Sequence, residues 1–418
     1  SLSWAFPRHD VCPQGDVIGV TACRSPFIFV VAGEPSGDAL GAGLITALRE
    51  RTGGNLRIAG VGGERMREEG LASLVPLDEL AVIGVAEVLP RAFAILRRVR
   101  ETVAAIRAQR PDAVVTIDSS GFSWRIAQRL RRHGETLPLV HYVAPMVWAW
   151  RAGRARRVAR WYDHMMALFP FEPPYFEREG LSCAYVGHPV LDSGADGGDA
   201  MRFRAAHGLG RDDLLIAVLP GSRGGEVRRL LPIFGAALRR LEQLIGPFRV
   251  AVPTVATVAP IVTEAVGGWP GAPILVRQAQ DKYDAFAASR AALAASGSVA
   301  LELAMARLPM VVAYRLNPLT EALLDRVVKV RQVNLVNLLL EQPLVCELLR
   351  GACTPERLAA EMARLVWDEP VRAAHRAGYD AAMRRLGAGD RSPSLKAADQ
   401  VLAIVAARRC DAFASPAP

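Results

Sequence analysis

The sequence predicts an α/β protein built from two doubly wound domains that face each other across a cleft. At 418 residues the chain is too long for one ordinary hydrophobic core, so two domains of roughly 200 residues each are expected. Short apolar runs without strict polar–apolar alternation, typical of parallel strands buried on both faces, alternate with amphipathic helical segments. An apolar run, a Gly/Ser turn and a helical segment open this pattern twice, at 27–45 and at 215–227, which indicates two Rossmann-like halves.

The predicted strands form two groups, separated by an Asp-, Ser- and Gly-rich stretch at 192–198 that indicates a linker. The first group is 27–32, 57–61, 113–117, 139–143, 164–168 and 184–186, and the second is 214–219, 248–252, 274–276, 291–294 and 310–314. Helical segments include 39–51 and 124–133, and helices close the chain over 354–407. The predicted parts are a flexible N-terminal extension (1–26), an N-terminal domain (27–192), a C-terminal domain (193–375), C-terminal helices (376–409) and a frayed tail (410–418).

The net charge of +9 and the pI near 9.6 indicate an anionic partner: nucleic acid, a phosphorylated ligand or an anionic membrane surface. Arginine supplies most of the excess and clusters at 91–110, 125–132, 151–160 and 228–240, where solvated helix faces are the plainer interpretation. Six scattered cysteines show no metal-ligand or disulfide spacing and are expected to be reduced cytosolic thiols. No apolar run reaches the roughly 18 to 20 residues that span a bilayer, and the first 25 residues lack a signal-peptide apolar core.

The Leu-Pro-Gly-Ser-Arg stretch at 219–223 carries the strongest local signal. A buried strand ends there and a helix begins, so Arg223 and free backbone N–H groups lie together where a helix N-terminus favours an anion. The chain has neither G-x-G-x-x-G nor G-x-x-x-x-G-K-[ST], so a dinucleotide fingerprint and a Walker phosphate loop are both excluded.

Three further turns follow predicted strands. Asp118 ends one strand before a Ser/Gly turn, where a carboxylate faces the cleft and can act as general base; the alternative is a helix cap. Ser36 and Asp38 follow the first strand, and their side chains can either contact a ligand or cap the next helix; the sequence favours neither role. His188 follows another strand, and a structural hydrogen bond is the commoner role for a lone histidine there.

The second domain repeats the theme at 295–302. Ser296, Gly297 and Ser298 can donate hydrogen bonds to a diphosphate, and Glu302 can accept from ribose hydroxyls; a capped helix start with a solvated Glu is the alternative. No D-x-D pair suited to a divalent metal is present, so helix N-termini and arginine are expected to meet leaving-group charge, and no metal or cofactor is expected.

In this order the motifs resemble the lipid-A-disaccharide synthases, glycosyltransferases with the two-domain GT-B fold. The resemblance runs collinearly from about residue 27 to 405. It rests on segments 31–38, 117–118, 141–151, 170–172, 186–189, 219–227, 295–298 with Glu302, 309–315, 337–338 and 347–348.

The resemblance implies an inverting transfer of glucosamine from UDP-2,3-diacylglucosamine to the 6-hydroxyl of 2,3-diacylglucosamine 1-phosphate. It implies that Asp118 is the base and that Arg223 binds the diphosphate. It also implies that 27–192 is the acceptor domain and 193–375 the donor domain. The C-terminal helices are expected either to pack back on their own chain or to be swapped between two chains. The implied donor-binding residues are Gly221, Ser222, Ser296, Gly297, Ser298, Glu302, Asn337 and Glu347. The implied acceptor and cleft residues are Glu34, Ser36, Gly37, Asp38 and His188.

The resemblance also suggests a role for the basic, apolar-studded segment 83–110: contact with acyl chains and with the anionic cytoplasmic face of the inner membrane of a Gram-negative bacterium. Burial of the same apolar stripe in the core is the alternative. The resemblance further implies that two chains can pair through their C-terminal segments. The predicted membrane or acyl residues are Val85, Val88, Leu89, Phe93 and Leu96.

Three positions depart from the family pattern. Gly121 stands where a second Asp is common, Val336 replaces a usual Pro, and Arg350 stands where Gln is common, which bears on details of both pockets. The competing interpretations are another GT-B enzyme with a UDP-N-acetylhexosamine donor, a sugar-nucleotide epimerase, and a non-catalytic nucleic-acid-binding protein. No recognised nucleic-acid-binding motif supports the last.

Overall fold

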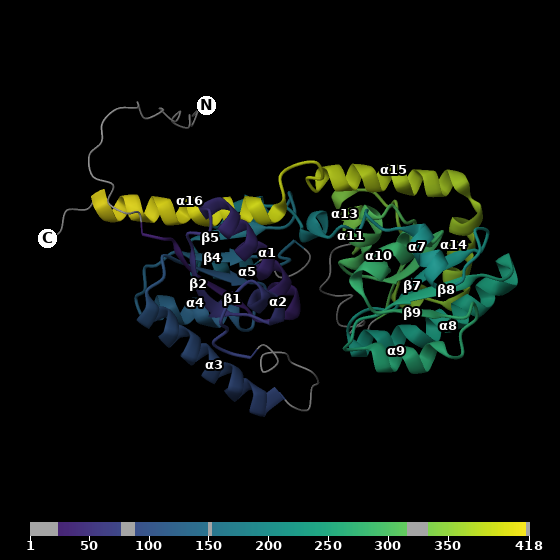
Figure 1. Cartoon of the computed structure of the whole chain (residues 1–418), viewed down its shortest axis with the longest axis horizontal. Helices are drawn as coiled ribbons and strands as arrows, with labels where there is room; N and C mark the ends of the chain where they lie inside the picture. Colours follow the sequence, from purple (N-terminus) through teal and green to yellow (C-terminus); the bar gives the residue numbers. More distant parts are fainter. Residues whose placement is uncertain (1–23, 77–87, 149–152, 316–332, 415–418) are drawn as a thin grey trace.

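The computed structural model describes residues 24–76, 88–148, 153–315 and 333–414. Most of the predicted N-terminal extension, residue Val85 and the last four residues of the predicted tail lie outside this description. Two lobes lie side by side, each around its own sheet (Figure 1). None of the described helices is long and apolar enough to cross a membrane.

The first lobe contains a six-stranded parallel sheet in the order β2-β1-β3-β4-β5-β6. The four interior strands β1, β3, β4 and β5 are buried along their whole length, as the continuous apolar runs predicted. Its strands are β1 (Phe27–Ala32), β2 (Arg57–Val61), β3 (Ala113–Ile117), β4 (Leu139–Tyr142), β5 (His164–Ala167) and β6 (Ser182–Tyr185).

The second lobe contains another six-stranded parallel sheet, in the order β12-β11-β10-β7-β8-β9. This is the strand order of a doubly wound nucleotide-binding fold. Its strands are β7 (Leu215–Leu219), β8 (Arg249–Pro253), β9 (Ile274–Val276), β10 (Ala291–Ala295), β11 (Met310–Tyr314) and β12 (Cys346–Leu349).

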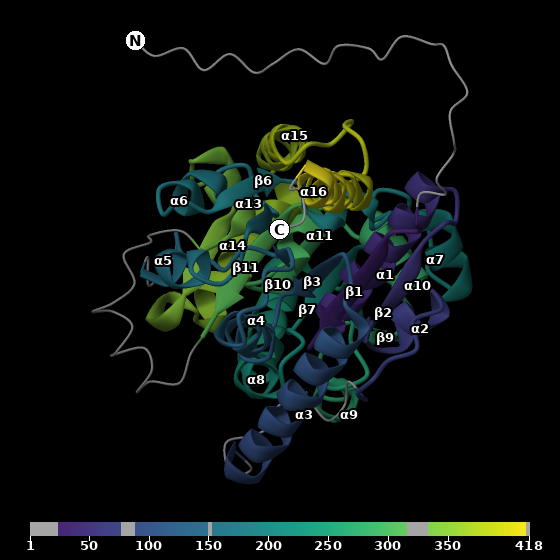
Figure 2. The same cartoon turned by 90° about the vertical axis from the view of Figure 1, so that its left-hand side faces the viewer.

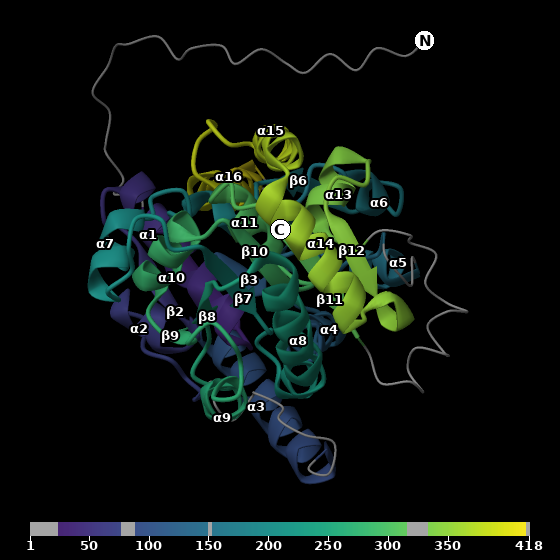
Figure 3. The ribbon, with the colours of Figure 1, turned by 90° about the vertical axis from the view of Figure 1, so that its right-hand side faces the viewer.

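Helices connect the parallel strands, because such strands need a crossover rather than a tight turn. Figure 3 shows α8 and α14 lying together on the second lobe, where they are in contact. The first-lobe helices are α1 (Pro35–Thr52), α2 (Glu64–Glu68), α3 (Val88–Gln109), α4 (Ser123–Arg132), α5 (Gly153–Ala159) and α6 (Pro173–Glu177), followed by the 3-10 turn η2 (Pro189–Asp192). The remaining helices are α7 (Ala200–Ala206), α8 (Gly224–Ile245), α9 (Ala259–Val266), α10 (Ala279–Ala288), α11 (Val299–Met305), α13 (Leu335–Leu340), η3 (Arg350–Ala352), α14 (Pro355–Trp367), α15 (Glu369–Arg385) and α16 (Pro393–Ala414).

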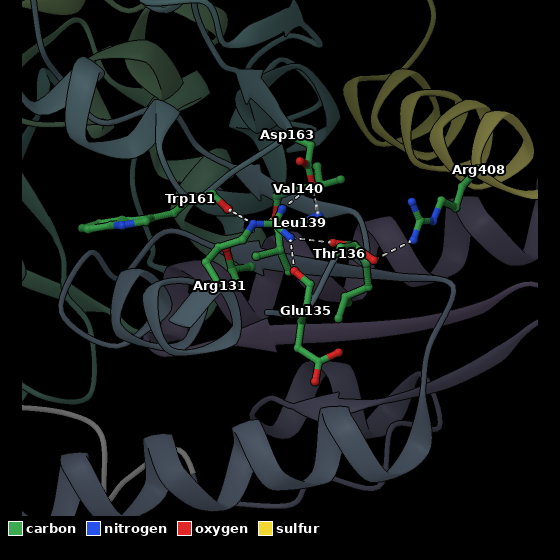
Figure 4. A network of polar contacts seen from close by, with 10 residues as sticks. Arg131, Glu135, Thr136, Leu139, Val140, Trp161, Asp163 and Arg408 are labelled. Atoms are coloured by element: carbon green, nitrogen blue, oxygen red, sulfur yellow. Dashed lines mark hydrogen bonds and ion pairs between the residues drawn. The ribbon is translucent and has the colours of Figure 1, made fainter. Parts of the chain in front are cut away.

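The last helix, α16, returns to the first lobe and packs on α1 (Figure 1). Arg51 of α1 forms an ion pair with Asp399 at 2.8 Å, and Arg409 forms another with Asp112 at 2.8 Å. Figure 4 shows a further tie, from Arg408 to Thr136. The end of the chain therefore lies on the lobe where the described chain begins.

Each sheet has one point where the strand order reverses direction along the chain, between β1 and β3 in the first lobe and between β7 and β10 in the second. Ligands of open α/β sheets bind beyond the carboxyl ends of the strands at such a point. The segments that follow these four strands carry Glu34 and Ser36 (the latter in the first turn of α1), Asp118, Arg223, and the Ser296–Ser298 turn. Within each lobe, the strand order thus brings two of the predicted site segments together.

Several predicted bounds differ from the structure by one residue, and other differences are larger. Strand β6 starts at Ser182 rather than at 184, because its polar first residue pairs with β5 at the sheet edge. Strand β12 was not predicted, since it is a four-residue edge strand with Glu347 in its interior. Helix α1 begins at Pro35, four residues before the predicted start, with proline in its first turn.

Candidate active site

The described structure contains a cavity of about 550 Å³ at the carboxyl ends of β7, β8, β9 and β10. Arg65 of α2, in the first lobe, also lines it. A cavity of this size suits a nucleotide-sized ligand. It is lined by seven of the predicted residues: Gly221, Ser222, Arg223, Ser296, Gly297, Ser298 and Glu302.

The charge of this cavity favours an anion. Four cationic side chains line it, against the two carboxylates Glu226 and Glu302. Lys282 and Glu302 form an ion pair at 2.5 Å, so they largely neutralise each other. The other three cations are Arg65, Arg223 and Arg277, and none of these guanidinium groups has a hydrogen bond or ion pair within the described chain.

The turn after β7 requires glycine. Gly221 has φ of +112°, and a Cβ atom there would lie 2.4 Å from Oε2 of Glu226. Burial raises the pKa of Glu226, while Arg223 and Arg229 and the backbone N–H of Ser222 lower it in part. The half-buried Glu226 carboxylate therefore lies close against the turn, while Arg223, the N-cap residue of α8, is exposed.

Asp118 follows β3 in a left-handed backbone conformation, with φ of +48°. Its N–H donates to the carbonyl of Tyr142 at 2.9 Å, and its carboxylate accepts a long hydrogen bond of 3.4 Å from the Ser36 hydroxyl. Helix α4 begins only at Ser123 and has no side-chain cap, so the helix-cap alternative for Asp118 is wrong. Non-glycine residues in this conformation concentrate at functional sites.

The pKa of Glu34 depends on charged residues of both lobes. Desolvation raises the pKa of Glu34, the Asp118 carboxylate raises it further, and the Arg223 guanidinium lowers it in part. The loops after β1 and β3 and the N-terminus of α8 therefore share one electrostatic environment across the two lobes. The two residues predicted as catalytic, Asp118 and Arg223, both act on this one group.

Asp38 has a role that was not predicted. It is buried in the first turn of α1, yet it caps a different helix, α2. Its Oδ1 accepts from the N–H groups of Gly63 and Met66 at 2.6 and 3.2 Å, and its Oδ2 accepts from that of Arg65 at 3.0 Å. Capping of α1, the alternative weighed for Asp38, is therefore wrong, because its partners lie about 25 residues further along the chain.

The structure places four other predicted residues in hydrogen bonds or close packing. Gly37 is buried against the carbonyl of Ile117, 3.3 Å from where its Cβ would lie. His188 accepts from the N–H of Val190 at 3.1 Å through Nδ1, and burial lowers its pKa to about 4. Asn337 donates to Glu347 at 2.7 Å, and neither residue lines the cavity.

Sequence reasoning missed several cavity residues. Arg65, Arg277 and Lys282 lie in no motif that the sequence singled out. Thr254, after β8, is buried at 7% exposure, and its hydroxyl has no hydrogen-bond partner within the described chain. For Thr254 the available signal was a polar residue directly after a buried strand. For Arg65 the only local signal was the Gly-Gly pair at 62–63 shortly before it.

The predicted membrane segment lies on and before α3, which extends away from the rest of the first lobe (Figure 2). Leu96 is half-buried, and the side chains of Val88, Leu89 and Phe93 lie outside the described set. Val99, which shares the predicted apolar face, is fully buried in the first lobe's core, so the core alternative is right for this residue.

Comparison with known structures identifies the fold. The chain matches the calicheamicin glycosyltransferase CalG4 with a TM-score of 0.56 and 16% identity, covering 92% of this chain and 98% of that one. It matches Acinetobacter baumannii MurG with a TM-score of 0.55 and 14% identity, covering 90% and 99%. It also matches the Staphylococcus aureus MnaA–UDP structure with a TM-score of 0.59 and 14% identity, covering 90% and 95%. The chain thus has the two-domain GT-B fold.

Sequence comparison identifies the family. The family model for lipid-A-disaccharide synthetase matches residues 28–401. The lipid-A-disaccharide synthase of Rhodospirillum centenum is 54% identical over 382 residues, covering 91% of this chain and 95% of the relative. That of Paramagnetospirillum magneticum is 49% identical over 378 residues, covering 90% and 97%. This chain belongs to the lipid-A-disaccharide synthase family of glycosyltransferases.

Proposed function

We propose that this protein transfers 2,3-diacylglucosamine from its UDP conjugate to the 6-hydroxyl of 2,3-diacylglucosamine 1-phosphate. The products are the β-1,6-linked lipid A disaccharide 1-phosphate and UDP. Family membership supports the reaction class, and the cationic cavity in the second lobe supports a nucleotide diphosphate as the donor's leaving group.

In the proposed mechanism Asp118 is the general base. Its carboxylate takes the proton of the acceptor 6-hydroxyl as that oxygen attacks the anomeric carbon of the donor. The bond from this carbon to the diphosphate breaks on the opposite face, so the configuration inverts and no covalent enzyme intermediate forms. UDP leaves with the bonding electrons, and Arg223 together with the loops at 221–222 and 296–298 stabilises the charge that develops on it.

The observation that carries this assignment is the electrostatic environment of Glu34. Asp118, in the first lobe, and Arg223, in the second, both shift the pKa of Glu34, in opposite directions. A base and a leaving-group residue that both lie near enough to one carboxyl to shift its pKa fit a reaction centre between the lobes.

The test is turnover with both acylated substrates in detergent, with disaccharide and UDP as the products measured. Asp118→Asn should lower kcat by roughly a thousandfold and Arg223→Gln by about a hundredfold or more, since each removes one catalytic group. Asp212→Asn, an exposed carboxylate in the second lobe, is the matched control and should keep wild-type turnover. An Asp118→Asn protein with more than a tenth of wild-type turnover would overturn the base assignment. Faster turnover of an unacylated UDP-N-acetylhexosamine would favour the other GT-B activity.

We also propose that α3 brings the protein to the anionic cytoplasmic face of the inner membrane of a Gram-negative bacterium. The groove between α3 and α4 supports this proposal. Among the described residues, its lining consists of two apolar residues, Val103 and Ala104, and five basic ones, of which Arg107 forms an ion pair with Glu135 at 2.7 Å. The five basic residues are Arg100, Arg107, Arg129, Arg132 and His133.

Vesicle sedimentation tests the membrane proposal. The protein should bind vesicles with anionic lipid and not neutral ones, and added salt should weaken binding. Replacing Phe93 and Leu96 by Ser should lower vesicle binding several-fold, whereas Leu244→Ser, an exposed leucine on α8, should not. Equal binding by the double variant and the wild type would contradict the proposal.

Sedimentation equilibrium of the purified protein without vesicles tests whether two chains pair.

A further inference from the structure

Arg65 is a first-lobe residue in a second-lobe cavity. All other described residues that line the cavity belong to the second lobe, at the strand ends, loops and helices of its sheet. Arg65 lies in the first turn of α2, directly after β2 at the edge of the first sheet. A ligand in the cavity would therefore contact both lobes.

The backbone of Arg65 is held rigidly. Its N–H donates to Asp38 at 3.0 Å, and the N–H groups of Gly63 and Met66 donate to the same buried carboxylate. Met66 is fully buried, and α1 approaches it so closely that a Cβ at Gly41 would lie 2.4 Å from its Sδ atom. The first turn of α2 is thus fixed against α1 by three hydrogen bonds and by packing.

The guanidinium group of Arg65, in contrast, is exposed and has no hydrogen bond or ion pair within the described chain. Arg67, two residues further on, donates from Nε to the carbonyl of Gly63 at 3.3 Å and does not line the cavity. A cation in the first turn of a helix opposes the helix dipole, so helix stability does not explain Arg65 at this position. Arg65 instead lines a cavity whose charge favours an anion.

We propose that Arg65 binds the diphosphate of the donor nucleotide from the lobe opposite to Arg223, and that Asp38 is the positioning residue that aims it. This inference rests on the proposed function, which places a UDP-sugar in the cavity. Guanidinium pairs with phosphate oxygens through two parallel hydrogen bonds, which fixes orientation as well as charge. Donor binding then links the two lobes directly, because the same diphosphate contacts cations from both.

The first experiment measures the affinity of the purified full chain for UDP and for uridine, without acylated substrate. Arg65→Gln should weaken UDP binding by roughly tenfold or more, the usual effect of one charge-assisted hydrogen bond, and leave uridine binding unchanged. Arg65→Lys should recover only part of the loss, because the bidentate geometry is missing. Arg67→Gln is the matched control on the same helix and should bind UDP as the wild type does.

The outcomes separate this inference from the proposed function. If Arg223→Gln weakens UDP binding and Arg65→Gln stays within twofold of wild type, the Arg65 inference is overturned and the donor site stands. If neither variant changes UDP affinity, the donor site of the proposed function fails and the inference fails with it. Equal losses for UDP and uridine, or a similar loss in Arg67→Gln, would overturn the phosphate contact.

The second experiment tests Asp38 as a positioning residue. Asp38→Asn should weaken UDP binding several-fold, since an amide nitrogen replaces one acceptor oxygen. The double variant Asp38→Asn/Arg65→Gln should bind UDP no more weakly than Arg65→Gln alone, because Asp38 acts through Arg65. Additive losses in the double variant would show that Asp38 acts independently and would overturn its positioning role, whatever its effect on thermal stability.

Discussion

The backbone of Asp118 shows how one residue can serve the site against its own conformational preference. Asp118 and Ser119 both have positive φ, +48° and +46°, directly after a buried strand. For a side chain with a Cβ atom this region costs about 1 kcal/mol or more relative to ordinary helical geometry. The cost is offset by the rigid sheet, and it turns the carboxylate towards Ser36 and the loop that carries Glu34.

Asp118→Gly should therefore stabilise the fold while it removes turnover. The fold is stabilised because glycine adopts positive φ freely. Turnover is lost because the carboxylate proposed as the general base, which also raises the pKa of Glu34, is removed. We expect the free energy of unfolding to rise by about 0.5–1 kcal/mol, because the strain that glycine relieves exceeds the stability lost to the greater entropy of glycine in the unfolded chain. Glu341→Gly is the matched control, since Glu341 has φ of +59° at the exposed C-cap of α13. It should gain similar stability and keep wild-type turnover; a destabilised Asp118→Gly would contradict the strain argument.

At the level of elements, buried parallel strands were the most predictable part of the fold. Strands β1, β3 and β11 have the predicted bounds, because a short apolar run limited by polar or turn residues is itself the physical requirement for a doubly buried strand. The edge strands β2 and β9 have the predicted bounds as well. The other two edge strands, β6 and β12, were less predictable, since an edge strand tolerates polar residues such as Ser182 or Glu347. The strand order, which brings the four site loops together, depends on long-range packing that no local pattern encodes.

The candidate site was predictable to the same extent. Residues in turns after strands, such as Arg223 and the Ser296–Ser298 turn, could be placed at the cavity because topology puts every such turn at one edge. Asp38 was misjudged because its partners belong to another helix, and local spacing shows only the helix that follows. Arg65 was missed for the same reason: its place in the cavity depends on how the two lobes face each other.

At the scale of the whole molecule, the two connections between the lobes lie next to each other. Asp192, at the end of the first lobe, accepts hydrogen bonds from Ser392 and Ser394 at 2.8 and 3.2 Å, just where the chain returns. The hydroxyl of Tyr185 donates to the carbonyl of Leu386 at 2.6 Å in the same region. The lobes are thus joined at this point, and the cavity lies at the carboxyl ends of the second-lobe strands, where Arg65 of the first lobe also lines it. Contact of one ligand with both lobes is consistent with this arrangement.

Buried titratable groups set the pH range in which the whole molecule is stable. Burial lowers the pKa of His141 to about 3 and those of His188 and His375 to about 4. Burial has the opposite consequence for Glu172, whose pKa rises to about 7 although its carboxylate accepts from the indole of Trp148 at 3.2 Å and from two backbone N–H groups.

These shifts predict a loss of stability on acidification. The folded histidines stay neutral while the unfolded ones bind protons, so their contribution is full above pH 6.5 and is lost as pH falls towards 4. Between pH 6.5 and 4.5 this amounts to roughly 2 kcal/mol for each histidine. Glu172 has the opposite sign: its contribution is full below its ordinary pKa and is lost as pH rises towards 7, so on acidification it offsets about one histidine.

Calorimetry from pH 4.5 to 8 should therefore show unfolding temperatures that fall with decreasing pH, for both lobes if they unfold separately. Glu172→Gln cannot take up a proton, so the acid loss in the first lobe should become steeper than in the wild type. Glu264→Gln, on the surface helix α9 of the second lobe, is the control and should leave the slope unchanged. A wild-type unfolding temperature that stays constant from pH 6.5 to 4.5 would contradict the assignment of neutral buried histidines. A slope unaltered by Glu172→Gln would show instead that the carboxyl of Glu172 is ionised throughout this range, held by its three hydrogen bonds.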